Sequence, residues 1–194
     1  MPVTYTNRKG RRYFLCQGRA KSGKARYYFA KEIKDEPVDE IPEGYKIRES
    51  VNGNVYLVKD LPELISQAEV SLIEAELAHH PQERRYAVNT KHDRIIIYEM
   101  SGPAAEDLAK AFGAYVPGYT GLEDQIQHFL EKNSQYAPVM QFILSDPERH
   151  IFRAQRWCYL GSVDDWIDIG YGSLQGLAQS FIPLLGTEEF FDLY

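Results

Sequence analysis

The sequence predicts an α+β protein in which a small N-terminal antiparallel β module precedes an antiparallel sheet with helices packed on it. Residues 11–59 are rich in strand-forming residues that are interrupted by turn formers. From Ser66 onward the apolar residues recur at helical spacing, and the expected order is helix, hairpin, helix, hairpin, helix. Because 194 residues suffice for one large or two small domains, we expect a basic β module over residues 1–62 and an acidic α+β domain over residues 63–194.

The N-terminal module is expected to contain two hairpins. Residues 11–16 and 26–31 are rich in aromatic side chains, and the polar segment between them contains glycine, which predicts a hairpin with a long turn. In the second hairpin, residues 45–50 and 54–59 flank a turn that contains Asn52-Gly53. Asn-Gly is the favoured pair for a tight type I′ turn, because both central residues of that turn need a positive φ. A loop with two prolines and five acidic residues should join the two hairpins.

Four helices are expected in the second domain. Ser66 followed by Glu69 is a capping-box pair ahead of a one-sided apolar pattern, and Thr120 followed by Glu123 is another. Between these two helices, a shorter helix should end at Gly113. The last helix is predicted by apolar residues that share one helical face, Leu174, Leu177, Ala178, Phe181, Ile182 and Leu185.

Two further hairpins are expected between these helices. Residues 84–89 and 94–99 form the first, and residues 138–144 and 150–160 form the second, which is longer. Because helices flank both hairpins, the strands should form an antiparallel sheet that the helices cover on one side.

The charge of the chain is unevenly distributed. The net charge of −6 is an average over two unlike segments. Residues 1–34 hold ten lysines and arginines against one acid, Glu32, and so carry +9. The remaining residues hold 12 basic and 27 acidic side chains and carry −15. A basic N-terminal segment is therefore joined to an acidic body.

Several classes of protein are disfavoured by the sequence. Cys16 and Cys158 lie far apart and have no partners at zinc-ligand spacing, so neither a disulfide scaffold nor a zinc site is indicated. The N-terminus lacks the apolar region of a secretory signal. The longest uncharged stretch, residues 169–187, is too rich in glycine and polar residues to cross a membrane. We therefore expect a cytoplasmic protein without a membrane segment.

Two strings resemble motifs of enzymes. Residues 18–25, GRAKSGKA, match a phosphate-binding loop except at Ala25, where the motif needs a hydroxyl for magnesium, and a hairpin turn is the favoured interpretation. Asp164, Asp165 and Asp168 match a DDxxD string, and three such acids can hold a cation. The favoured alternative for these acids is a turn in which Asp164 or Asp165 caps backbone N–H groups and Trp166 is buried.

The remaining signals do not favour an enzyme. No pair of histidines has metal-ligand spacing, no GxSxG elbow activates a serine, and no cofactor is indicated. A metal-dependent hydrolase or transferase that uses the DDxxD acids is the third of the hypotheses about function.

The first hairpin carries the candidate binding residues. Its cations alternate with aromatic rings, a combination that suits nucleic acid because cations contact phosphates while rings stack on bases. Aromatic residues in strands also serve as sheet core, and a basic segment can instead dock on an acidic protein, on the acidic body or on another copy of the chain. The candidate residues are Arg11, Arg12, Tyr13, Arg19, Lys21, Lys24, Arg26 and Tyr28.

Several segments along the chain form a distinctive set. In the N-terminal part they are YTNRKG (5–10), SGKARYYF (22–29), IPEGYKI (41–47) and NGNVYL (52–57), and in the C-terminal part PVMQFIL (138–144), RWCYLGSVDDWIDIG (156–170) and FFDLY (190–194). Together these segments resemble a family of uncharacterised bacterial proteins. This resemblance covers most of the chain, is weakest near residues 80–120, and implies a bacterial cytosolic protein with the same division into two parts. It assigns no activity and no catalytic residue.

The leading hypothesis is a non-enzymatic binding protein that uses its cationic, aromatic hairpin to contact nucleic acid or an acidic protein partner. The second hypothesis is a structural protein that docks or self-assembles through the same charges, and then a homo-oligomer is expected. Both hypotheses rest on the opposite charges of the two parts of the chain.

Overall fold

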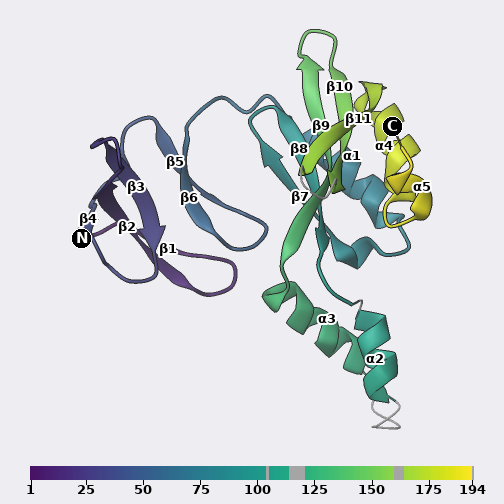
Figure 1. The fold of residues 1–194 in the computed structure, drawn as a ribbon, viewed down its shortest axis with the longest axis horizontal. Helices are drawn as coiled ribbons and strands as arrows, with labels where there is room; N and C mark the ends of the chain where they lie inside the picture. The colour runs from purple at the N-terminus through teal and green to yellow at the C-terminus, as the bar shows by residue number, and fades with distance from the viewer. Residues whose placement is uncertain (104, 114–120, 160–163, 194) are drawn as a thin grey trace. The chain divides into compact units, whose positions relative to one another are not determined.

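The structure, a computed structural model, describes residues 1–103, 105–113, 121–159 and 164–193. The chain divides into two units, Met1–Pro62 and Glu63–Tyr194. The predicted α+β fold is confirmed, with an N-terminal β module followed by antiparallel sheet and helices (Figure 1).

Strands form almost all of the regular structure of the N-terminal unit. The strands β1, β2 and β3 pair in that order, and the short strand β4 pairs with β2 beside β1. The strands β5 and β6 form a separate hairpin. The strands β1 and β4 were not predicted, because each is only two or three residues long and is held by pairing with β2. The bounds are β1 Thr4–Thr6, β2 Arg12–Arg19, β3 Ala25–Ala30, β4 Glu36–Pro37, β5 Tyr45–Glu49 and β6 Val55–Lys59.

The three hairpins of this unit use the same turn. Each has a three-residue loop, 8–10, 21–23 or 51–53, that ends in a glycine with positive φ, such as Gly53 at +77°. In each loop the glycine N–H donates to the carbonyl three residues earlier, at 2.8 to 2.9 Å. The predicted type I′ turn at residues 52 and 53 is therefore wrong: Asn52 does not have a positive φ. A three-residue loop with a left-handed glycine is the next most common connection in such hairpins.

The first predicted hairpin has longer strands and a shorter turn than expected. The pairing of β2 with β3 extends to Arg19↔Ala25, so residues 17–19 and 25 belong to the ladder and not to the turn. The phosphate-loop string thus lies in two strands and a hairpin turn, as the favoured interpretation expected.

The second unit is built on one five-stranded antiparallel sheet. Its strands lie in chain order, so that β11 and β7 are the two edges. The strand β11 was not predicted, because acids and glycines are depleted in strands; here pairing with β10 from end to end holds these residues extended. The bounds are β7 Tyr86–Lys91, β8 Arg94–Met100, β9 Tyr136–Asp146, β10 Ile151–Tyr159 and β11 Asp164–Ser173.

The longer helices of this unit fall into two groups, and the short helix α5 (Glu188–Phe191) follows them. The helices α1 (Gln67–Ala78) and α4 (Leu174–Phe181) pack on the sheet, whereas α2 (Ala105–Gly113) and α3 (Leu122–Asn133) pair with each other between β8 and β9 (Figure 1). The capping box of Ser66 and Glu69 is confirmed: the Ser66 hydroxyl accepts from the Glu69 N–H, and the Glu69 carboxylate accepts from the Ser66 N–H. The predicted cap at Thr120 lies outside the described residues. No helix in the described ranges is long and apolar enough to cross a membrane.

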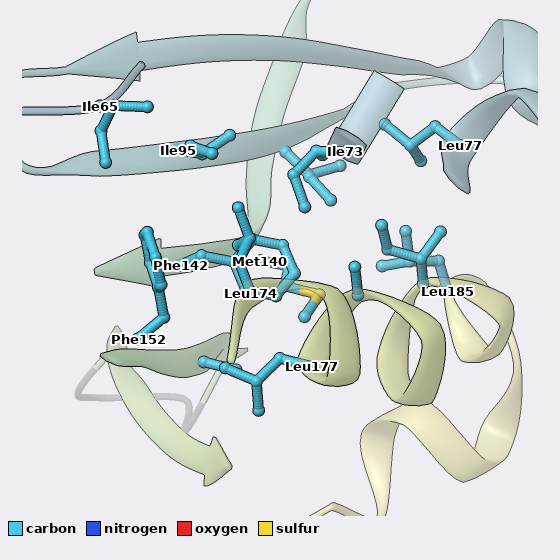
Figure 2. Packing of buried hydrophobic residues seen from close by; sticks show 14 of the residues in the cluster. Ile65, Ile73, Leu77, Ile95, Met140, Phe142, Phe152, Leu174, Leu177 and Leu185 are labelled. Carbon is cyan, nitrogen blue, oxygen red and sulfur yellow. The ribbon is translucent and has the colours of Figure 1, made fainter. Parts of the chain in front are cut away.

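The core of the second unit lies between the sheet and the helices α1 and α4 (Figure 2). Alternate residues of the central strands supply it, and Phe142 of β9 is fully buried beside Ile95 of β8 and Ala154 of β10. The helices close it with residues at helical spacing, including Ile73 of α1 and Leu177 of α4. Five of the six apolar residues predicted for the last helix are buried, and Phe181 is half-buried.

Tyr86 carries an unusual buried hydroxyl. The hydroxyl has no hydrogen-bond partner among the described residues. Burial, with a smaller contribution from the charge of Glu99, raises the pKa of Tyr86 above its ordinary value of 10.0. The folded state therefore favours the neutral phenol, and the stability that depends on it is present below about pH 10 and is lost as the pH rises further.

We expect Tyr86→Phe to raise the free energy of unfolding at neutral pH by about 1 kcal/mol, because it removes an unsatisfied buried group. The variant should also lose less stability than the parent above about pH 10. Urea unfolding at neutral and alkaline pH measures both effects. Tyr171→Phe is the control, because Tyr171 is 67% exposed. Equal alkaline losses in the parent and in Tyr86→Phe would contradict the prediction.

Candidate binding site

The structure separates the predicted cations into two groups at opposite ends of β2. Arg19, Lys21, Lys24 and Arg26 surround the turn between β2 and β3, and we call these four residues the hairpin tip. Arg11 and Arg12 lie where β2 begins. Arg19 lies seven positions after Arg12 along the strand, or about 23 Å away at 3.3 Å per residue. The predicted residues therefore do not form one continuous surface.

All six cations are exposed. Within the described part of the chain, none of their side chains is in an ion pair, whereas the neighbouring Arg8 lies 3.6 Å from Glu49. At the hairpin tip, four unpaired positive charges share one short turn and the strand ends beside it. Such a concentration of charge attracts polyanions and is screened by salt.

Neither of the two predicted aromatic residues is exposed as the cations are. Tyr13 is 9% exposed and belongs to the core of the N-terminal unit. Tyr28 is half-buried, and its hydroxyl donates to the carboxylate of Asp35. Of the predicted set, the cations are thus the exposed members.

The contact between Asp35 and Tyr28 lies directly beside Gly18. A Cβ atom on Gly18 would lie 2.9 Å from Asp35 Oδ2 and 3.3 Å from Tyr28 Cε1, so a side chain there would displace this contact. The hydrogen bond to Asp35 raises the pKa of Tyr28 to about 12. Asp35 was missed by sequence reasoning, because a carboxylate in a loop gives no signal of the tyrosine that it binds.

We expect Asp35→Asn to move the pKa of Tyr28 from about 12 back toward its ordinary value of 10.0. NMR of tyrosine ring carbons measures this titration, with Tyr28→Phe to assign the signal. Because the folded pKa is raised, the contact stabilises the fold below pH 10 and fails as the pH approaches 12. Glu36→Gln is the control, since it removes a neighbouring carboxylate. A pKa of Tyr28 that is equal in the parent and in Asp35→Asn would contradict the assignment.

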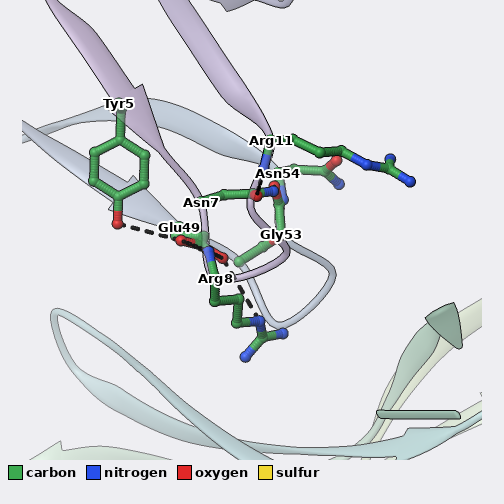
Figure 3. Close-up of polar contacts among 8 residues, drawn as sticks. Tyr5, Asn7, Arg8, Arg11, Glu49, Gly53 and Asn54 are labelled. Carbon is green, nitrogen blue, oxygen red and sulfur yellow. Dashed lines mark hydrogen bonds and ion pairs between the residues drawn. The ribbon is translucent and has the colours of Figure 1, made fainter. Parts of the chain in front are cut away.

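Near the beginning of β2, hydrogen bonds link the residues that precede this strand to the β5–β6 hairpin (Figure 3). Asn7 is 4% exposed; its Nδ2 donates to the Gly53 carbonyl at 2.6 Å, and its Oδ1 accepts from the Arg11 N–H at 2.8 Å. Glu49 of β5 accepts from the Tyr5 hydroxyl at 3.2 Å and from the Arg8 N–H at 3.1 Å. These bonds hold the backbone of the 8–10 loop. Asn7 was also missed, although an asparagine directly ahead of a glycine-ending loop is a signal for such a turn.

The structure does not bring the three acids of the DDxxD string together. They lie on β11, where successive residues point to opposite faces, so Asp164 and Asp165 diverge. Asp168 accepts from Gln155 Nε2 at 2.7 Å and lies 3.6 Å from Arg153 Nε. Among the described residues, no group of three side chains could hold a metal ion. The predicted turn is wrong, since pairing with β10 makes the segment a strand, and Trp166 is half-buried; Asp165 does accept from the Trp166 N–H, at 2.7 Å.

The chain matches no protein-family model, and comparisons with curated proteins and with solved structures also give no match. The resemblance to a bacterial family therefore stays a prediction.

Proposed function

We propose that the protein is a binding protein whose hairpin tip contacts the phosphate backbone of a nucleic acid. The observation that supports this most is the placement of the two arginines of the tip. Arg26 lies opposite Gly18 in the ladder, whereas Arg19 lies opposite Ala25. Because residues directly opposite each other share a face and successive residues alternate, Arg19 and Arg26 are on opposite faces of the ribbon.

A ribbon with cations on both faces suits a groove better than a flat surface. The major groove of DNA is wide enough for a two-stranded ribbon and has a row of phosphates on each side. In such a groove, the two arginines face opposite walls, while Lys21 and Lys24 lie at the turn that enters the groove first. Tyr13 is buried, and the Tyr28 hydroxyl is hydrogen-bonded to Asp35. We therefore expect the protein to contact phosphates and not to distinguish base sequences.

The test is the salt dependence of binding to duplex DNA and duplex RNA, measured by fluorescence anisotropy. Four phosphate contacts predict a slope of about −3.6 in log K against log salt, or a roughly hundredfold loss between about 50 and 200 mM. Replacing Arg19 and Arg26 by serine should flatten the slope by about 1.8.

The matched control replaces Arg11 and Arg12 by serine. It removes the same number of arginines from the same unit, but at the other end of β2, and should leave the slope unchanged. Absence of binding at low salt, or equal effects of the two double variants, would exclude the proposal.

A second candidate function is docking on an acidic protein, which includes a second copy of the chain. It is supported by the charge of the second unit, because residues 63–194 hold 9 basic and 20 acidic side chains, or −11. Sedimentation of the full chain at low and high salt tests it. Self-docking requires a larger mass at low salt and its loss in the Arg19→Ser, Arg26→Ser variant; an unchanged mass would count against it.

A further inference from the structure

The sheet of the second unit opens between β9 and β10. The pairing of these strands ends at Arg156↔Met140, although β10 continues beside β11 to Tyr159 and β9 continues beside β8 to Tyr136. The sequence accounts for this opening. Pro138 has no N–H to donate to a ladder, and the register of β9 shifts next to it.

A cavity of about 230 Å³ lies at this opening. Its most buried lining residues are Met100, Leu185 and Phe190, each at most 2% exposed. Tyr159 and Phe191 also line it and are 65% and 54% exposed. The cavity thus combines a deeply buried apolar part with exposed aromatic side chains. Ala137 and Val139 of β9 and Trp157 of β10 complete this apolar lining.

The polar side chains of the lining are Ser101 and one ion pair. Arg85 Nη2 lies 3.2 Å from Glu99 Oε1 and donates to the Met100 carbonyl, while Nη1 donates to the Gly102 carbonyl. A guanidinium has five N–H donors, and these three bonds use both N–H groups of Nη2 but only one of Nη1, so Nη1 keeps a second N–H for a ligand. The lining therefore offers a donor and an acceptor with no net charge.

We propose that this cavity binds a small uncharged phenol. A cavity of about 150 Å³ with an apolar lining takes benzene, so the larger volume here suits one aromatic ring with a polar substituent. The ring packs against Trp157 and Phe190, its hydroxyl hydrogen donates to Glu99, and its hydroxyl oxygen accepts from Arg85. A charged ligand would compete with one member of the ion pair and leave the other uncompensated. The proposal is independent of the hairpin tip, which lies in the other unit.

The test is titration of the full chain with p-cresol, followed by NMR of the tryptophan indole N–H groups. The chain has two tryptophans, and Trp166→Phe leaves Trp157 as the only signal. We expect a saturable shift of the Trp157 signal. Binding of 4-methylbenzoate and 4-methylbenzylamine should be at least about tenfold weaker, and that of toluene several-fold weaker, because it lacks the hydroxyl.

A variant that fills the cavity gives an independent check. Ala137→Leu should weaken p-cresol binding at least tenfold, and the control Ala87→Leu, which alters a half-buried residue of β7 outside the cavity, should not. N-acetyltyrosinamide distinguishes the source of the phenol: tighter binding than p-cresol indicates a tyrosine side chain of a peptide, and weaker binding a free small molecule. No saturable shift, tighter binding of either charged analogue, or undiminished binding by a folded Ala137→Leu would overturn the proposal.

Discussion

Replacing Phe142 by alanine is expected to lower the free energy of unfolding of the second unit by about 3–5 kcal/mol. Phe142 is fully buried in β9, the central strand of the five, and packs in the core that α1 and α4 cover (Figure 2). Alanine loses the burial of the ring and leaves a cavity that the surrounding strands and helices cannot fill. Since domains are stable by only about 5–15 kcal/mol, the variant should be close to unfolding.

Urea unfolding, followed by tryptophan fluorescence, measures this loss, because both tryptophans lie in the second unit. Phe129→Ala is the control: Phe129 of α3 is 63% exposed, and we expect a change within about 0.5 kcal/mol. Similar effects of the two substitutions would mean that Phe142 is not the buried centre of the sheet.

Replacing Asn7 should have the largest effect in the N-terminal unit. Asn7→Ala leaves the Gly53 carbonyl and the Arg11 N–H without their partner, and each buried unsatisfied group costs roughly 1–3 kcal/mol. Asn7→Asp is nearly isosteric and keeps the acceptor for Arg11. However, it places a second carboxylate oxygen 2.6 Å from the Gly53 carbonyl, where the amide now donates. We therefore expect aspartate to be at least as destabilising as alanine.

Thermal unfolding of the full chain, with circular dichroism and NMR signals of the N-terminal strands, measures this effect. Asn54→Ala is the matched control, since Asn54 follows the 51–53 loop and is exposed. If Asn7→Asp were as stable as the parent, the amide would not be donating to Gly53, and the link between the two hairpins would have to be reassigned.

Local signals predicted much of the fold. The capping pair at Ser66 and the spacing of the apolar residues in α4 depend on neighbours within a few turns, so the sequence alone shows them. In contrast, β11 is a strand only because β10 pairs with it along its whole length. The strand β1 consists of strand-forming residues, but three residues are too few to predict a strand without the pairing with β2.

The candidate site was predictable only in part. That the N-terminal hairpin is cationic follows from the sequence, and the cations are exposed because charged side chains are rarely buried unpaired. Which aromatic rings are buried does not follow, because rings occur on both faces of the hairpin. Tyr13 lies in the core because of packing, and the Tyr28 hydroxyl is hydrogen-bonded to Asp35 of a loop. The spacing of residues in the sequence predicts neither contact.

The edge strand β11 has a consequence for the solubility of the protein. Among the described residues β11 pairs with β10 alone, and a long strand with one open edge is a template on which another chain can add a strand and begin aggregation. Exposed Asp164, Asp165 and Asp168 place negative charges along this edge, and the register shift next to Ala154 twists it away from the flat shape that such addition needs. The acids that make β11 a poor strand in isolation thus keep its open edge from recruiting other chains.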